Sequence, residues 1–138
     1  MRIMAIDYGD AHTGIAISDP TGFLAGYTTV INAYRPEAVA DRICALIAEH
    51  GVEELVLGHP INMDGSRGPR SEKAQAMKAL LEQRTSLPVV LWDERRTTID
   101  AHQILFNSGK NAKQRKKVVD AVAASLILEG YLTFKKSH

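Results

Sequence analysis

The sequence has a single cysteine, Cys44, among its 138 residues. One cysteine excludes an internal disulfide and a cysteine metal cluster, and we expect Cys44 to be a small core residue. No apolar run approaches the roughly 18 residues of a membrane span. The start, Met-Arg-Ile-Met-Ala-Ile-Asp, contains no signal-peptide core. We therefore expect a cytoplasmic protein.

Acidic residues are scarce at the C-terminal end. Residues 101–138 hold 7 Lys and Arg but only 2 Asp and Glu, whereas residues 1–100 hold 10 and 14. The net charge of +1 hides this asymmetry. Local positive charge favours a polyanionic partner, because phosphate binding depends on local potential; a solvated basic face is the alternative.

The length fits one domain spanning residues 1–138. Apolar and β-branched runs predict strands over residues 2–7, 14–19, 24–31, 54–58 and 88–92. Helical spacing and capping residues predict helices over residues 36–51, 69–84, 99–106 and 117–134. Residues 58–70 are dense in Gly and Pro, which predicts a loop.

This order predicts an α/β fold. Three consecutive strands form an antiparallel meander, and the later strands join it in parallel, so the fold is a mixed five-stranded sheet with helices on both faces. The first strand is then central. We expect Trp92 in the core, and residues 107–117, which are basic and lack large apolar side chains, in an exposed mobile loop.

Acids follow two of the predicted strands. Asp7 ends the first strand, while Asp93 and Glu94 end the strand before them; in this topology both ends lie at one edge of the sheet. Asp120 stands in an apolar helix, where an ionised carboxylate is costly unless something positive meets it. Other readings stay open: Asp7 could begin a turn, Asp120 could serve its helix dipole, and either Asp93 or Glu94 could point inward.

Three carboxylates at one point would repel by about 4 kcal/mol per pair at 4 Å in an effective dielectric near 20. Divalent cations remove that penalty. Oxygen ligands favour Mg²⁺ or Mn²⁺ over zinc, and the sequence offers no His-x-x-x-His pair. Two such ions, about 3.5 to 4 Å apart, are suited to phosphodiester hydrolysis. The acids therefore predict a metal-dependent hydrolase.

Five motifs occur together along the chain. They are Asp7-Tyr8-Gly9, Gly14-Ile15-Ala16-Ile17-Ser18-Asp19, Pro60-Ile61-Asn62-Met63-Asp64-Gly65-Ser66, Asp93-Glu94-Arg95 and Val119-Asp120-Ala121-Val122-Ala123-Ala124. In this combination the chain resembles the YqgF (RuvX) family over nearly its whole length. The family comprises pre-16S rRNA nucleases that are also called Holliday junction resolvase-like proteins.

The resemblance implies an RNase H-like fold and a divalent-metal nuclease with Asp7, Glu94 and Asp120 as its acidic triad. It ranks Glu94 above Asp93. It also implies a role in processing the 5′ end of the small-subunit rRNA precursor.

The sequence departs from the family pattern in two places. Ala11 and His12 stand where the family often has a Lys-Arg pair, and His59 replaces a leucine usual before Pro60. The first departure puts a contact between this turn and nucleic acid in doubt. His12 could still contact a phosphate, or it could be an exposed residue without a role.

Several polar and basic residues could contact nucleic acid. Some lie around the start of the second predicted helix, some follow the second acid, and the rest belong to the basic stretch. In these places they are suited to hold phosphates or to add non-specific affinity for nucleic acid. They are Asn62, Ser66, Arg67, Arg70, Arg95, Arg96, Lys110, Lys113, Arg115, Lys116 and Lys117. We expect structured RNA, such as pre-rRNA, or branched DNA as the partner, and a monomer with a dimer left open.

Three other functions remain. A Holliday junction resolvase acting on DNA would use the same chemistry, although resolvases normally act as dimers. Asp7-x-Gly9 with Gly14 also resembles the phosphate motif of actin-like ATPases and sugar kinases, but those need two domains. A non-catalytic RNA-binding ribosome-assembly module is the third.

Overall fold

The computed structural model describes residues 1–19, 25–60, 68–93 and 112–137. Its strands are β1 (Ile3–Asp7), β2 (His12–Ser18), β3 (Ala25–Asn32), β4 (Glu54–His59) and β5 (Val89–Asp93). Its helices are α1 (Pro36–His50), α2 (Pro69–Arg84) and α4 (Ala112–Ser137). The helix predicted over residues 99–106 lies outside the described residues. In the part of the chain that is described, no helix is long and apolar enough to cross a membrane.

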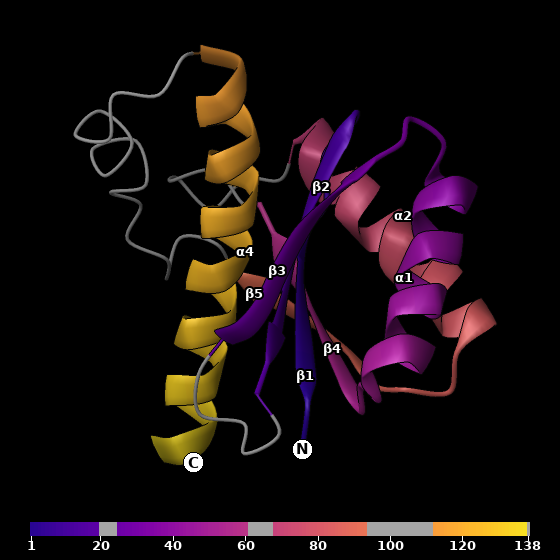
Figure 1. Ribbon diagram of the computed structural model, residues 1–138. Helices are drawn as coiled ribbons and strands as arrows, with labels where there is room; N and C mark the ends of the chain where they lie inside the picture. Colours follow the sequence, from indigo (N-terminus) through magenta and orange to yellow (C-terminus); the bar gives the residue numbers. More distant parts are fainter. Residues whose placement is uncertain (20–24, 61–67, 94–111, 138) are drawn as a thin grey trace.

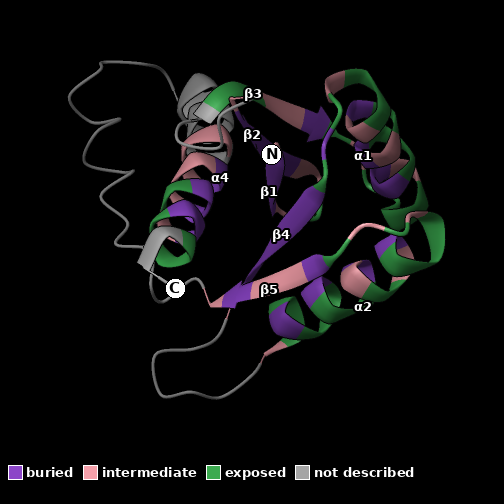
Figure 2. Cartoon of the chain, turned by 90° about the horizontal axis from the view of Figure 1, so that it is seen from below, coloured by how far each residue is buried: buried purple, intermediate pink, exposed green. Residues whose placement is uncertain are grey.

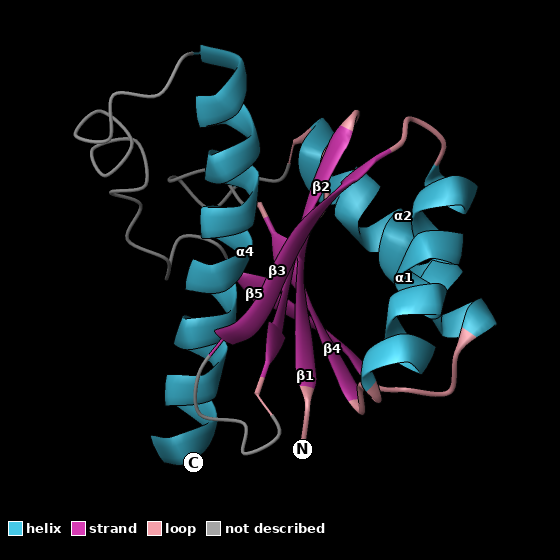
Figure 3. Cartoon of the chain, in the orientation of Figure 1, coloured by secondary structure: helices cyan, strands magenta, loops and turns pink. Residues whose placement is uncertain are grey.

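The strands form one mixed sheet in the order β3-β2-β1-β4-β5 (Figure 1, Figure 3). β1 pairs with β2 antiparallel and with β4 parallel, β2 pairs with β3 antiparallel, and β4 pairs with β5 parallel. The predicted five-stranded sheet with a central first strand is therefore confirmed.

Helices cover both faces of the sheet, with α1 and α2 on one side and α4 on the other (Figure 1). Successive side chains of a strand point to opposite faces. In β1, Met4 and Ile6 pack in the cluster that includes α1 and α2, whereas Ile3 and Ala5 pack in the cluster that includes α4. All four of these residues are buried. In Figure 2 β4, which pairs with β1, is likewise drawn in the purple of buried residues. The continuous apolar strands thus have a core on each side.

Two helices begin and end as the sequence predicts. Pro36 and Pro69 each occupy the first turn of a helix, where the missing N–H costs no hydrogen bond. Gly51 follows α1 with a φ of 66° in the left-handed region that glycine adopts readily. Within α1, Cys44 is only partly buried, so the prediction of a core residue is wrong.

The start of α4 differs from the prediction. The helix begins at Ala112, so residues 112–117 are helical and the predicted loop over them is wrong. These residues are Ala, Lys, Gln and Arg, which all have high helix propensity. An apolar face further along a helix is enough to hold such a polar extension, because propagation adds one hydrogen bond per residue without a new nucleus.

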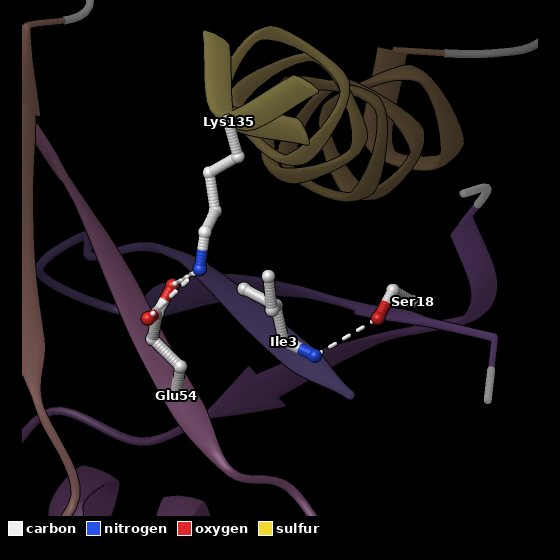
Figure 4. Close-up of polar contacts among 4 residues, drawn as sticks. All are labelled: Ile3, Ser18, Glu54 and Lys135. Atoms are coloured by element: carbon white, nitrogen blue, oxygen red, sulfur yellow. Dashed lines mark hydrogen bonds and ion pairs between the residues drawn. The ribbon is translucent and has the colours of Figure 1, made fainter. Parts of the chain in front are cut away.

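Polar contacts fix the sheet at the end opposite Asp7 (Figure 4). Lys135 of α4 donates to both carboxylate oxygens of Glu54 at 3.1 Å. The Ile3 N–H donates to the hydroxyl of Ser18 at 2.8 Å across the first hairpin. Trp92 is buried and packs edge-to-face on Tyr131, as predicted for a core residue. The Lys135 and Tyr131 contacts join α4 to β4 and β5, and the Ser18 contact joins β1 to β2.

Candidate functional site

Asp7 is the last residue of β1, the central strand. Ile3 and Ala5 pack on the α4 side of the sheet, so the alternation of the strand places Asp7 on that face too. Its side chain is partly buried. On the neighbouring strand Gly14 stands opposite Asp7 in register, and glycine places no side chain there. Asp7 is therefore the acid that the fold brings to the carboxyl edge of the sheet beneath α4.

Asp93 lies on the other face. It ends β5 and pairs in register with His59 of β4. Trp92 and Val90 pack with the α4 cluster, so the alternation places Asp93 on the face of α1 and α2. The structure thus does not bring Asp93 and Asp7 together. Glu94, the other acid at this strand end, lies outside the described residues.

Asp120 belongs to α4, and its side chain is not described. Ala124, Ile127 and Leu128 of the same helix are fully buried in the cluster on the sheet. Position 120 precedes Ala124 by four residues and Ile127 by seven, which is the spacing of one helix face. Position 120 therefore lies on the same stripe of α4 as Ala124 and Ile127.

Among the described side chains, no group of three or more His, Cys, Asp or Glu gathers closely enough to hold a metal ion. Glu94 and Asp120 are not among these described side chains, so the predicted metal-binding triad stays a prediction. Asn62, Ser66, Arg67, Arg95, Arg96 and Lys110 also lie outside the described residues.

The turn after Asp7 rests on the start of α2. Lys73 donates to Asp10 at 2.5 Å, and the hydrogen bond and charge of Lys73 lower the pKa of that carboxyl. This contact lies at a recess of about 20 Å³, enough for about one water. The recess is lined by Tyr8, Gly9, Asp10, Arg70 and Lys73. Burial, followed by the charge of Asp10, raises the pKa of the Tyr8 phenol. Arg70 is exposed beside this turn.

Gly9 allows the turn to close. A Cβ at this position would lie 2.3 Å from the carbonyl oxygen of His12. The Gly9 N–H meets the hydroxyl of the buried Thr13 at 3.4 Å. The glycine of the Asp7-Tyr8-Gly9 motif thus allows the backbone of the turn to approach His12 closely. In this way it helps to fix the strand end that carries Asp7.

His59 forms a buried network that the sequence did not predict. Its Nε2 lies 2.6 Å from the hydroxyl of Ser71 in the first turn of α2, and Gln75 lies 3.3 Å from both. A groove of about 500 Å³ runs past His59, Gln75 and Leu91 on the α1 and α2 side. Since Asp7 occupies the other face, this groove is separate from the acid site. The one signal in the sequence was the unusual histidine before Pro60.

A family model described as "RuvX: Holliday junction resolvase" matches residues 1–134 of the chain. The chain belongs to the RuvX family. This confirms the resemblance that the five motifs indicated.

Known RuvX relatives cover nearly the whole chain. A "Putative pre-16S rRNA nuclease" from Halothermothrix orenii is 45% identical over 135 residues, which are 98% of this chain and 96% of the relative. A protein of the same name from Pelotomaculum thermopropionicum is 44% identical over 133 residues, 96% of this chain and 86% of the relative. The relatives confirm the prediction of a nuclease, a hydrolase acting on ester bonds.

Among solved structures, T. thermophilus RuvC in complex with Holliday junction substrate is similar to this RuvX chain with a TM-score of 0.65. The match covers 98% of this chain and 96% of RuvC at 14% sequence identity. At that identity the likeness shows the fold alone, and it confirms the predicted RNase H-like architecture.

Proposed function

We propose that this RuvX chain is a divalent-metal nuclease that trims the 5′ end of pre-16S rRNA. The observation that carries the proposal is Asp7, delivered by the central strand to the sheet face that α4 covers. The named relatives at 45% and 44% identity support the substrate class.

Asp7, Glu94 and Asp120 would hold the metal. The side of the sheet supports Glu94 over Asp93, because Asp93 faces α1 and α2, on the side of the sheet away from Asp7. Carboxylate oxygens suit Mg²⁺ or Mn²⁺. When bound, one or two such ions supply an activated water and stabilise the leaving oxygen. The chain's part is to hold carboxylates at a fixed strand end and on a packed helix.

Basic residues around this edge would hold the RNA backbone. Arg70 is exposed beside the turn that follows Asp7. Lys113, Arg115, Lys116 and Lys117 belong to the N-terminal turns of α4, the same helix that carries Asp120. A rigid helix is a better frame for phosphate contacts than the loop predicted there, because less conformational entropy is lost on binding. The remaining contacts are proposed from residue type and place in the sequence alone. They are Asn62, Ser66, Arg67, Arg95, Arg96 and Lys110.

The test compares four purified variants on a 5′-extended pre-16S rRNA fragment with Mg²⁺ or Mn²⁺. Asp7→Asn, Glu94→Gln and Asp120→Asn should each lower cleavage at least about 100-fold, since loss of a supporting group alone costs 10- to 100-fold. Asp93→Asn is the matched control and should keep most activity. Circular dichroism checks that all four remain folded. Full activity in the three triad variants would refute the mechanism.

A DNA junction resolvase is the second candidate, favoured by the description of the matching family model. The same assay, with a four-way DNA junction in place of the RNA, distinguishes the two candidate functions. Symmetric cleavage of the junction with the RNA left intact would favour the resolvase. RNA binding without cleavage under either metal would instead favour an assembly module.

A further inference from the structure

His12 is part of the sheet and lies on the face of Asp7. The sequence places it in the hairpin turn, but β2 begins at His12. Ile15 and Ile17 pack toward α1 and α2, and Ala16 packs toward α4, so the alternation of β2 places His12 on the α4 side. Asp7 occupies that side on the neighbouring strand.

The register brings His12 near Asp7. Asp7 is paired with Gly14, and His12 is two residues from Gly14 along β2. Such diagonal neighbours have Cα atoms about 7–8 Å apart. Gly14 adds no side chain between them. A nucleic-acid strand whose reactive phosphate lies at Asp7 would therefore pass within reach of the His12 ring.

Asn32 fixes the orientation of the His12 ring. The two residues are opposite one another in the β2–β3 ladder, and Nδ1 of His12 lies 2.6 Å from Oδ1 of Asn32. The amide oxygen accepts, so Nδ1 donates, and Nε2 remains the ring atom for another partner. The pair is at the surface, where a phosphate can approach. The ladder also continues past the pair, since the Ala33 N–H donates to the Ala11 carbonyl at 3.1 Å.

We propose that His12 is a substrate-binding residue whose Nε2 donates a hydrogen bond to a phosphate oxygen next to the cleaved bond, and that Asn32 is its positioning residue. The ring donates from Nε2 when it carries its second proton. This inference rests on the proposed function, because it takes the reaction to occur at Asp7. It gives this chain a phosphate contact at a turn that lacks the Lys-Arg pair.

The experiment measures RNA affinity and turnover separately. The dissociation constant for a 5′-extended pre-16S rRNA fragment is measured in EDTA at low salt, where no cleavage occurs, and KM and kcat are measured with Mg²⁺. His12→Ala should raise Kd and KM about ten-fold, the cost of losing a hydrogen bond to a charged group. The value of kcat should stay within about two-fold, because the contact is made equally before and during the reaction.

Three further variants sharpen the result. His12→Lys keeps a cationic donor and should bring Kd back to within about three-fold of the unaltered protein. Asn32→Ala leaves the imidazole but frees its orientation, so Kd should rise by a smaller factor, about three-fold. His50→Gln is the matched control, because His50 ends α1 and stacks on Tyr27, with ring centroids 4.5 Å apart, at the other end of β3. It should leave Kd and KM unchanged.

The possible failures are distinguishable. Unchanged Kd and KM in His12→Ala, with a lower melting temperature, would show that the pair only stabilises the hairpin and would overturn the proposal. A fall in kcat at constant KM would also overturn it. If the unaltered protein cleaves no RNA but His12→Ala still weakens binding in EDTA, the contact stands and the proposed nuclease function fails.

Discussion

Lys135 and Glu54, 81 residues apart in the chain, form a two-oxygen ion pair with both N···O distances at 3.1 Å. Glu54 is only 8% exposed, so its charge needs this partner. Tyr131, one turn before Lys135, also donates to Glu54, and the Lys135 ammonium lies 5.6 Å from its ring centroid. The C-terminal turns of α4 are thereby fixed to the start of β4.

Removal of the lysine should destabilise the fold. Lys135→Met leaves a nearly buried carboxylate without its cation, which we expect to lower the free energy of unfolding by about 2 kcal/mol. Urea denaturation measures the change. The matched control is Lys78→Met, which breaks the pair of Lys78 with Glu82 on the surface of α2. That pair spans one helical turn and should cost no more than about 0.5 kcal/mol. Equal losses in the two variants would contradict the prediction.

Tyr131 should make the protein sensitive to alkali. Burial, and then the hydrogen bond and charge of Glu54, raise the pKa of this phenol. The unfolded chain releases the proton at about pH 10, whereas the folded chain retains it. The stabilisation is therefore complete below about pH 10 and is lost as the pH rises through the folded-state pKa.

The free energy of unfolding is measured as a function of pH from about pH 8 upward, a range that includes the ordinary pKa of tyrosine. Tyr131→Phe should begin about 1 kcal/mol less stable at neutral pH, from the lost hydrogen bond, and then decline less steeply in alkali. Tyr34→Phe, at an 81% exposed position, should follow the unaltered protein. Parallel curves for all three would exclude Tyr131 as the source of the alkaline sensitivity.

Gly9→Ala should disturb the turn that follows Asp7. The new methyl group would lie 2.3 Å from the His12 carbonyl oxygen, so backbone must move. We expect a loss of about 1–3 kcal/mol and reduced nuclease activity at temperatures where the variant is still folded. Gly130→Ala is the control. The new Cβ would lie 3.4 Å from its nearest neighbour, an atom of the Trp92 ring, and alanine favours the helix. If Gly9→Ala keeps full stability and activity, the turn is not constrained in this way.

Ser18→Ala should weaken the first hairpin. It leaves the buried Ile3 N–H without its acceptor, at a cost of about 1–2 kcal/mol. Thr85→Ala removes a similar but longer bond, 3.3 Å to the Leu87 N–H in a partly buried place, and should cost less. Thermal unfolding of both variants decides the order. The reverse order would show that the Ser18 hydroxyl adds little.

The sheet was predictable because its pattern is unambiguous. Residues 54–58 and 88–92 are apolar on both faces, as parallel strands buried between helices must be. The meander followed from short connections, which placed Asp7 at the central strand's end. These rules fix which residue ends a strand to within one or two positions.

The site was less predictable, because an uncertainty of one residue at a strand end changes the face of the sheet on which a side chain lies. One residue decides whether a side chain lies under α4 or under α2, so sequence alone left Asp93 and Glu94 open. The start of α4 was missed because Ala112 and the basic residues after it carry helix propensity without an apolar face. His12 was assigned to the turn because a strand's first residue gives no pattern of its own.

The packing of α4 also sets a sequence of events during synthesis. α1, α2 and all five strands precede α4 along the chain, so the face of Ile3, Ala5, Ala16 and Val56 is already made before the helix that covers it. Until then the nascent chain shows an uncovered apolar surface, of the kind that chaperones bind and that aggregates.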